Sequence, residues 1–100
     1  MTFKEQVTEI VKRVPYGKVT TYGTVATLAG SPRAARMVAG ILHLEEQSLP
    51  WQRIINKQGH ISIRGCVYDK NFQKRLLEQE GIEVSPDFMI DLDRYGWWGN

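Results

Sequence analysis

The sequence contains a single cysteine, Cys66, among its 100 residues. One cysteine excludes an internal disulfide and is typical of proteins in a reducing compartment. No apolar run approaches the roughly 20 residues needed to span a bilayer, and residues 1–5 lack the apolar core of a signal peptide. We therefore expect a cytoplasmic protein that neither crosses a membrane nor is exported.

Histidine is scarce as well, with only two in the chain. His43, His60 and Cys66 do not have the spacing of zinc ligands, so we expect no metal, and no motif indicates another cofactor. Cys66 also has no histidine near it in the sequence that would act as its base. A lone cysteine of this kind usually fills space in an apolar core.

The composition is that of an ordinary globular domain, with 42% hydrophobic and 24% charged residues. We assign one domain to residues 1–100. The net charge is only +2, but residues 1–75 hold 12 lysines and arginines against five acidic residues, whereas residues 76–100 hold one against six. This asymmetry is compatible with a polyanion site on part of the surface, although it also occurs in proteins that never bind DNA.

Apolar residues near the N-terminus recur at the spacing of an amphipathic helix: Phe3, Val7, Ile10, Val11 and Val14. Pro15 then ends this helix. Thr21 is the expected N-cap of a short second helix, which Gly30 terminates. Ser31 and Pro32 predict the start of a third helix, because serine is a good cap and proline loses nothing at the first helical position.

The third helix should run to about His43, and together with the second helix it predicts a helix-turn-helix around Gly30. Residues 53–55 and 60–63 are β-prone runs joined by a turn at 56–59, which predicts a hairpin. The expected fold class is therefore mainly α with a small β-hairpin wing, a winged helix-turn-helix.

The C-terminal third predicts one more helix, which should carry Phe72, Leu76 and Leu77 and end at Gly81. Beyond it the sequence has no clear periodicity. We expect the tail to fold back onto the domain through its apolar residues Val84, Phe88, Ile90 and Leu92.

The third helix presents two different faces. Its apolar face consists of Ala34, Val38, Ile41 and Leu42. Arg36, Gly40 and His43 lie on another face, where the small residues would let the backbone approach a nucleic-acid groove. Arg33 and Arg36 are candidates for contacts with phosphates or between bases. The residues alone, however, favour a plain solvated face.

Three segments carry a more specific pattern: Pro-Tyr-Gly-Lys-Val-Thr-Thr-Tyr-Gly at 15–23, Ser-Pro-Arg-Ala-Ala-Arg at 31–36 and Pro-Trp-Gln-Arg at 50–53. They resemble the DNA-binding domain of O6-alkylguanine-DNA alkyltransferases, and the resemblance extends over residues 2–84. Those enzymes carry Pro-Cys-His-Arg at the third segment. The chain is therefore more similar to the alkyltransferase-like proteins, non-catalytic relatives that bind such lesions, and this implies the fold of the alkyltransferase C-terminal domain.

The resemblance gives roles to residues of the helix-turn-helix. In that family the helix enters the minor groove, and an arginine that corresponds to Arg36 fills the gap left by the target nucleotide. A guanidinium plane suits this role because it stacks in the gap and donates to the orphaned base. A tyrosine that corresponds to Tyr22 rotates the phosphate; otherwise Tyr22 is a half-buried aromatic at a helix start. Arg33 and Gly40 complete the expected DNA-binding set.

The nucleophile of the family is missing here. Alkyl transfer needs a thiolate activated by a base, but the cysteine and histidine positions are Trp51 and Gln52, and glutamine is no base near pH 7. We therefore expect no enzymatic activity. Glu80, at the glutamate position, is interpreted as a structural acceptor. A displaced nucleophile at Cys66 is the alternative.

The same resemblance implies a pocket for the modified base. Trp51 would form a flat wall against it, with Gln52 and Arg53 beside this wall. Arg64 aligns with an arginine that senses the electronic character of the modified guanine, and a cation over an aromatic face contributes about 0.5–2 kcal/mol. Without the resemblance, Trp51 is a core tryptophan and Arg64 an exposed arginine at the end of the wing.

The sequence thus predicts a monomer, associated with the nucleoid, that binds duplex DNA containing O6-alkylguanine through the minor groove. It would flip the nucleotide into a pocket and leave it unchanged, either shielding the lesion from alkyltransferase or presenting it to nucleotide excision repair proteins. Three alternatives stay open: a repair enzyme that uses Cys66, a sequence-specific winged-helix regulator, and a protein-interaction module that no longer binds DNA.

Overall fold

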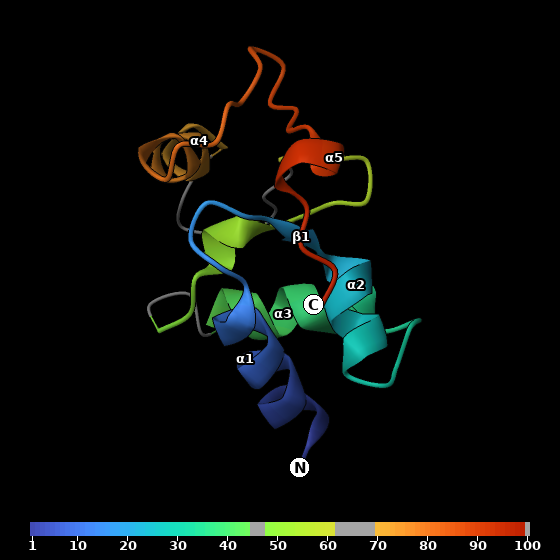
Figure 1. Cartoon of the computed structure of the whole chain (residues 1–100). Helices are drawn as coiled ribbons and strands as arrows, with labels where there is room; N and C mark the ends of the chain where they lie inside the picture. Colours follow the sequence, from blue (N-terminus) through green and yellow to red (C-terminus); the bar gives the residue numbers. More distant parts are fainter. Residues whose placement is uncertain (45–47, 62–69, 100) are drawn as a thin grey trace.

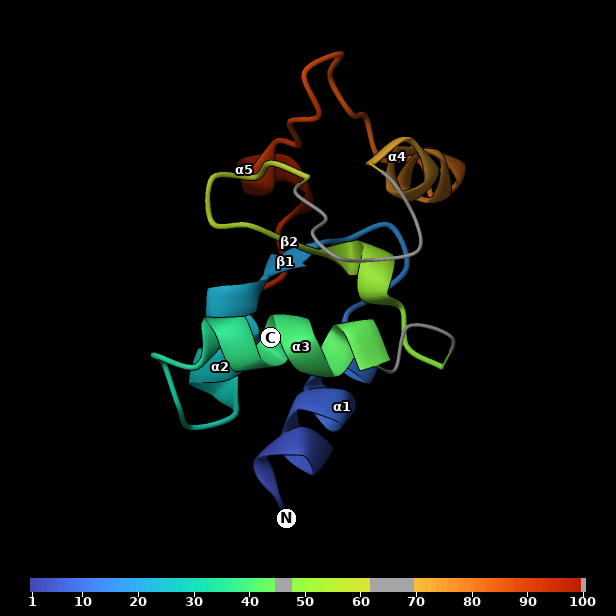
Figure 2. The same cartoon turned by 180° about the vertical axis from the view of Figure 1, so that it is seen from behind.

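The computed structural model describes residues 1–44, 48–61 and 70–99. Its elements are α1 (Phe3–Arg13), β1 (Thr20–Thr21), α2 (Tyr22–Leu28), α3 (Ala35–Leu44), the 3-10 turn η1 (Trp51–Arg53), β2 (Ile54–Ile55), α4 (Lys70–Gln79) and α5 (Leu92–Tyr95). Figures 1 and 2 show α1, α2 and α3 at one end of the molecule and α4 and α5 at the other, with the strands between them. The predicted mainly α fold is confirmed. Within the described residues no helix is both long and apolar enough to cross a membrane.

The first two helices begin and end close to where the sequence predicts. Thr2 opens α1 with a capping box, in which its hydroxyl accepts the Glu5 N–H at 3.1 Å and the Glu5 carboxylate accepts the Thr2 N–H at 3.0 Å. The hydroxyl of Thr21 caps α2 by accepting the Thr24 N–H at 3.0 Å. Gly30 follows α2 with φ +88°, which agrees with its predicted role as a helix terminator.

The predicted start of the third helix at Ser31 and Pro32 is wrong. The Ser31 carbonyl accepts the Ala34 N–H at 2.9 Å, and this bond closes a tight turn instead of opening a helix. The helix α3 begins at Ala35. Arg33 consequently lies in the turn before α3 and not on the helix itself.

The sheet contains a pairing that the sequence did not predict: Ile54–Ile55 pairs with Thr20–Thr21 in parallel register. Residues 62–63 of the predicted hairpin lie outside the described residues, so the hairpin stays a prediction. The expected turn does form, with the Gly59 N–H donating to the Asn56 carbonyl at 3.0 Å. His60 then pairs with Met89 from the tail. A parallel pair between distant segments has no local turn signal, so the nearby hairpin was the pairing that the sequence suggested.

Two clusters of buried side chains form the core. The first lies among α1, α2 and α3 and includes Val7, Val11, Val25, Val38, Leu42 and Ile54. The second includes Val19, Ile55, Ile61, Leu77, Ile82, Ile90 and Tyr95. Successive strand residues point to opposite faces, so Ile54 enters the first cluster and Ile55 the second. The strand β2 therefore joins the two halves of the core.

The C-terminal segments pack as predicted. The helix α4 carries Phe72, Leu76 and Leu77, and Val84, Phe88, Ile90 and Leu92 all contribute to the second cluster. Trp97 is buried in the first cluster. The backbone N–H of Trp97 donates to the Val19 carbonyl at 2.7 Å, so the tail is fixed beside β1.

Two glycines with left-handed backbone provide a matched test of this tail packing. A Cβ on Gly59 (φ +83°) would lie 2.6 Å from the Ile90 carbonyl oxygen, whereas a Cβ on Gly30 (φ +88°) would meet nothing within 4 Å. We expect Gly30→Ala to lower the free energy of unfolding by about 1 kcal/mol, the penalty of left-handed alanine. Gly59→Ala should lower it by about 2–4 kcal/mol, because the clash adds to that penalty. Urea unfolding measures both, and equal losses would contradict the packing of the turn against Ile90.

Candidate nucleic-acid interface

The start of α3 exposes two arginines beside apolar surface. Arg33, Arg36 and Met37 are exposed, whereas Val38 and Leu42 point into the core. The two-faced helix that the sequence predicts is thus present. A pocket of about 490 Å³ lies at this end of the helix, lined by Ser31, Pro32, Arg33, Ala34, Arg36 and Met37. A cationic, partly apolar surface of this kind suits a groove of a nucleic acid.

Gly40 lies one turn further along the exposed side of α3. A Cβ at this position would meet nothing within 4 Å, so no part of the described protein covers the backbone here. Because Gly40 has no side chain, another molecule can approach the helix backbone closely at this point.

Tyr22 is the first residue of α2, directly after the Thr21 cap. Its ring is half-buried and packs against the first core cluster, which is what its aromatic character alone predicts. It does not line the pocket that contains Arg33 and Arg36. Its neighbours Thr21 and Gly23 instead line a separate pocket of about 460 Å³, which Pro32 shares with the arginine pocket. The two pockets are therefore adjacent.

The buried carboxylate of Glu80 organises the segment 50–53. It accepts the Gln52 amide at 2.9 Å, the Arg53 Nε at 3.0 and 3.1 Å, and the Gly17 N–H at 2.8 Å. The Glu80 side chain is 5% exposed and that of Arg53 is 16% exposed. We refer to Glu80, Gln52, Arg53 and Gly17 as the Glu80 cluster. The interpretation of Glu80 as a structural acceptor agrees with these bonds.

Arg53 points into the protein. Besides Glu80, it donates from Nη1 to the Val14 carbonyl at 3.0 Å, and its guanidinium lies 5.5 Å from the ring centroid of Tyr16. The Tyr16 hydroxyl in turn donates to the Gln79 carbonyl at 2.9 Å. These contacts make Arg53 a structural residue, and its predicted contribution to a base pocket stays a prediction.

Trp51 opens the turn η1 and is half-buried. Its ring stacks on that of Phe72 from α4, with the centroids 6.3 Å apart and the planes 25° from parallel, and it also packs against the first core cluster. The alternative of a core tryptophan is therefore partly right. The supported indole is held in one orientation, as a fixed wall requires.

Gln73 is a residue that sequence reasoning missed. Its side chain is buried, and its amide nitrogen donates to the carbonyl oxygens of Gln52 at 2.9 Å and of Ile54 at 3.4 Å. It thereby ties α4 to the turn η1. The available signal was its position four residues before the buried Leu77, on the inner face of α4. Arg64 and Cys66 lie outside the described residues.

Comparisons with known proteins place this arrangement among DNA-binding proteins. The family described as "6-O-methylguanine DNA methyltransferase, DNA binding domain" matches residues 2–82. A "DNA base-flipping protein" of Escherichia coli strain K12 is 49% identical over 98 residues, covering 96% of this chain and 74% of the relative. Alkyltransferase-like protein 1 of Schizosaccharomyces pombe is 39% identical over 101 residues, covering 95% and 94%.

Solved structures agree. The fold matches S. pombe Atl1 in complex with damaged DNA containing O6-carboxymethylguanine with a TM-score of 0.86 at 39% identity, over 95% of this chain and 94% of that one. It matches Mycobacterium tuberculosis OGT in complex with DNA with a TM-score of 0.61 at 29% identity, over 80% and 50%. The predicted alkyltransferase-like fold is confirmed.

The Glu80 cluster yields a stability test with a matched control. Arg53→Met should lower the free energy of unfolding by about 2–4 kcal/mol, because the buried Glu80 carboxylate loses its charged partner. Arg94→Met removes an ion pair with Glu83 in which the side chains are 60% and 79% exposed. That change should cost no more than about 1 kcal/mol. If both variants unfold at the same urea concentration, Arg53 is not the structural support described here.

Proposed function

We propose that this chain, which belongs to the DNA-binding-domain family of the 6-O-methylguanine DNA methyltransferases, recognises damaged duplex DNA without repairing it. It is an alkyltransferase-like member of that family. The support comes from relatives named for base flipping and for alkyltransferase likeness, and from a related structure solved with DNA that contains O6-carboxymethylguanine.

One observation carries the non-enzymatic part of the proposal. The side chain at the position of the family's histidine is the Gln52 amide, which donates to Glu80 at 2.9 Å. An amide of this kind does not take up a proton near neutral pH, so it cannot activate a thiol for attack. The neighbouring position holds the Trp51 indole, which is no nucleophile. The Glu80 carboxylate then serves to fix the turn η1.

The DNA-binding part follows from the exposed side of α3. We expect this helix to enter the minor groove, with Gly40 allowing close approach and Arg33 contacting a phosphate. Arg36 would fill the gap in the base stack and donate to the orphaned base. Tyr22, at the start of the neighbouring helix, would press on the phosphate of the extruded nucleotide. These contacts must offset the few kcal/mol that extrusion costs.

The extruded base would lie against Trp51. The stacking on Phe72 keeps the indole in place, so its position is set before the base arrives and binding loses less side-chain entropy. Gln52 belongs to the predicted edge of this pocket, and Arg64 is proposed to lie over the base as a cation that distinguishes one O6-alkylguanine from another.

A stable complex that leaves the lesion intact has two consequences in the cell. It shields the alkylated guanine from alkyltransferase, and it presents distorted DNA to nucleotide excision repair proteins. We propose that the protein acts in this way as a monomer associated with the nucleoid, without a cofactor.

The test is the affinity for a short duplex that contains one O6-methylguanine, compared with the same duplex containing guanine. Fluorescence anisotropy at two salt concentrations should show tighter binding to the lesion, with a salt dependence that reflects the phosphate contacts. Arg36→Ala should weaken lesion binding about tenfold or more, because the gap in the stack is left unfilled.

Lys57→Ala is the control, since it removes the same charge from an exposed position in the turn 56–59, which is bonded to the tail through the Ile90 N–H and the Gly59 carbonyl. Its effect should be less than about twofold. Equal binding to both duplexes would favour a sequence-specific regulator. Lesion affinity unchanged by Arg36→Ala would favour a protein-interaction module.

A further inference from the structure

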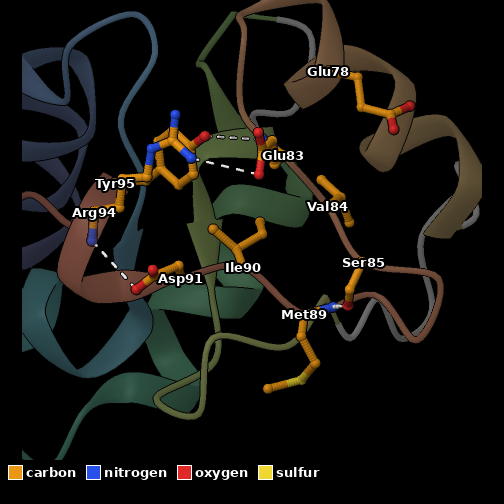
Figure 3. A pocket seen from close by; sticks show the side chains of 9 residues that line it. All are labelled: Glu78, Glu83, Val84, Ser85, Met89, Ile90, Asp91, Arg94 and Tyr95. Atoms are coloured by element: carbon orange, nitrogen blue, oxygen red, sulfur yellow. Dashed lines mark hydrogen bonds and ion pairs between the residues drawn. The ribbon is translucent and has the colours of Figure 1, made fainter.

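A further pocket lies between α4, α5 and the tail (Figure 3). These elements are on the far side of the sheet from α3 (Figure 1). The volume of the pocket is about 650 Å³, within the range of cavities that bind small molecules or several side chains. The proposed contact with DNA uses the exposed side of α3 together with Tyr22, Trp51 and Gln52, and none of these residues lines this pocket. It is therefore a separate site.

The inner surface of this pocket is apolar and well supported. Ile90 and Tyr95 are buried members of the second core cluster, and Val84 packs against that cluster. Figure 3 shows the Ile90 side chain in the space between the Glu83–Ser85 segment and Tyr95. The Tyr95 hydroxyl accepts the Glu83 N–H at 3.3 Å, which ties the two sides together. An aliphatic side chain entering here would meet a surface that is already in place.

The edge of the pocket is acidic. Glu78, Glu83 and Asp91 line it, against the single cation Arg94, and all three carboxylates are exposed. The stretch 76–100 as a whole contains six acidic residues and one basic residue. This surface repels DNA phosphates and attracts cations, so its charge is opposite to that of the arginine surface on α3.

The surroundings of Arg94 show that the edge of this pocket accommodates a guanidinium group. The guanidinium of Arg94 lies 4.9 Å from the centroid of the Tyr95 ring, and Nη1 lies 3.4 Å from a carboxylate oxygen of Glu83. An aromatic face beside a carboxylate is a good environment for a planar guanidinium. Because Arg94 and Glu83 are both largely exposed, their ion pair is weak and an incoming arginine can replace it.

We propose that this pocket is a docking site for a peptide segment of a partner protein, in which arginine or lysine flanks an aliphatic residue. The aliphatic side chain would pack on Ile90 and Tyr95, and the flanking cations would bind Glu83 and Asp91. The segment would dock whether or not DNA is bound to α3. This docking does not rest on the proposed function.

The probe is a fluorescein-labelled peptide, acetyl-Arg-Leu-Lys-Leu-Arg-amide, added to the free protein, since a basic peptide would itself bind DNA. We expect saturable binding by fluorescence anisotropy and amide chemical-shift changes centred on Val84, Met89, Ile90 and Asp91. Replacing both leucines of the peptide by serine, or its three cations by glutamate, should each weaken binding at least about fivefold. No binding, or shift changes located elsewhere, would overturn the proposal.

The protein variant that tests the site is Glu83→Gln combined with Asp91→Asn. Asparagine keeps the N-cap of α5, so the fold should be preserved while two charges are lost. Peptide affinity should fall about fivefold, and Glu9→Gln, which removes an exposed carboxylate from α1, should leave it unchanged. Equal affinity of the double variant and the wild type would sink the docking site.

The two proposals fail separately. The double variant should bind the O6-methylguanine duplex as the wild type does, because neither residue belongs to the α3 surface. If the wild type bound the peptide but not the lesion, the proposed function would be wrong and the docking site would stand.

Discussion

The candidate site depends on the hydrogen bonds that the buried carboxylate of Glu80 accepts. Glu80 lies just after α4, and its carboxylate binds two segments that are far away in the sequence. These are the loop after α1, through the Gly17 N–H, and the turn η1, through Gln52 and Arg53. Nearly buried charges are costly unless every lone pair finds a donor, and here the donors are supplied by those segments. Satisfying this one charge therefore fixes the turn that carries Trp51, and Gln73 holds the same turn from the other side.

The side chains of the turn η1 fit the proposed recognition of a base better than they fit chemistry on it. A nucleophile and its base need a proton to move between them, whereas Gln52 keeps its protons and its bond to Glu80 contributes only to structure. The indole of Trp51 has no reactive atom, but it is large, flat and supported by Phe72. Arg33, Arg36 and the backbone at Gly40 are exposed on and beside α3, where no part of the described protein covers them. The charge distribution divides the molecule further, with cations at α3 and carboxylates around the tail.

Local signals in the sequence predicted the helices well and the long-range contacts poorly. Thr21 and Gly30 determine where α2 begins and ends through their own backbone and side-chain chemistry, so their neighbours suffice. The pairing of Thr20–Thr21 with Ile54–Ile55 joins segments with two helices between them, and no local turn announces it. Ser31 and Pro32 carried the signal of a helix start, but the Ser31 carbonyl closes a turn instead. The motif located the candidate site, while the inward orientation of Arg53 depended on where Glu80 and Val14 lie in three dimensions.

The central claim is that the protein holds an alkylated base and leaves it unchanged, and the fate of the alkyl group tests it most directly. The protein is incubated in excess with duplex DNA that carries O6-methylguanine with a radiolabelled methyl group, and the complex is then separated into protein and DNA under denaturing conditions. The account predicts that all label stays on the DNA and that the recovered duplex still contains O6-methylguanine. Label attached covalently to the protein, at Cys66 or elsewhere, would contradict it.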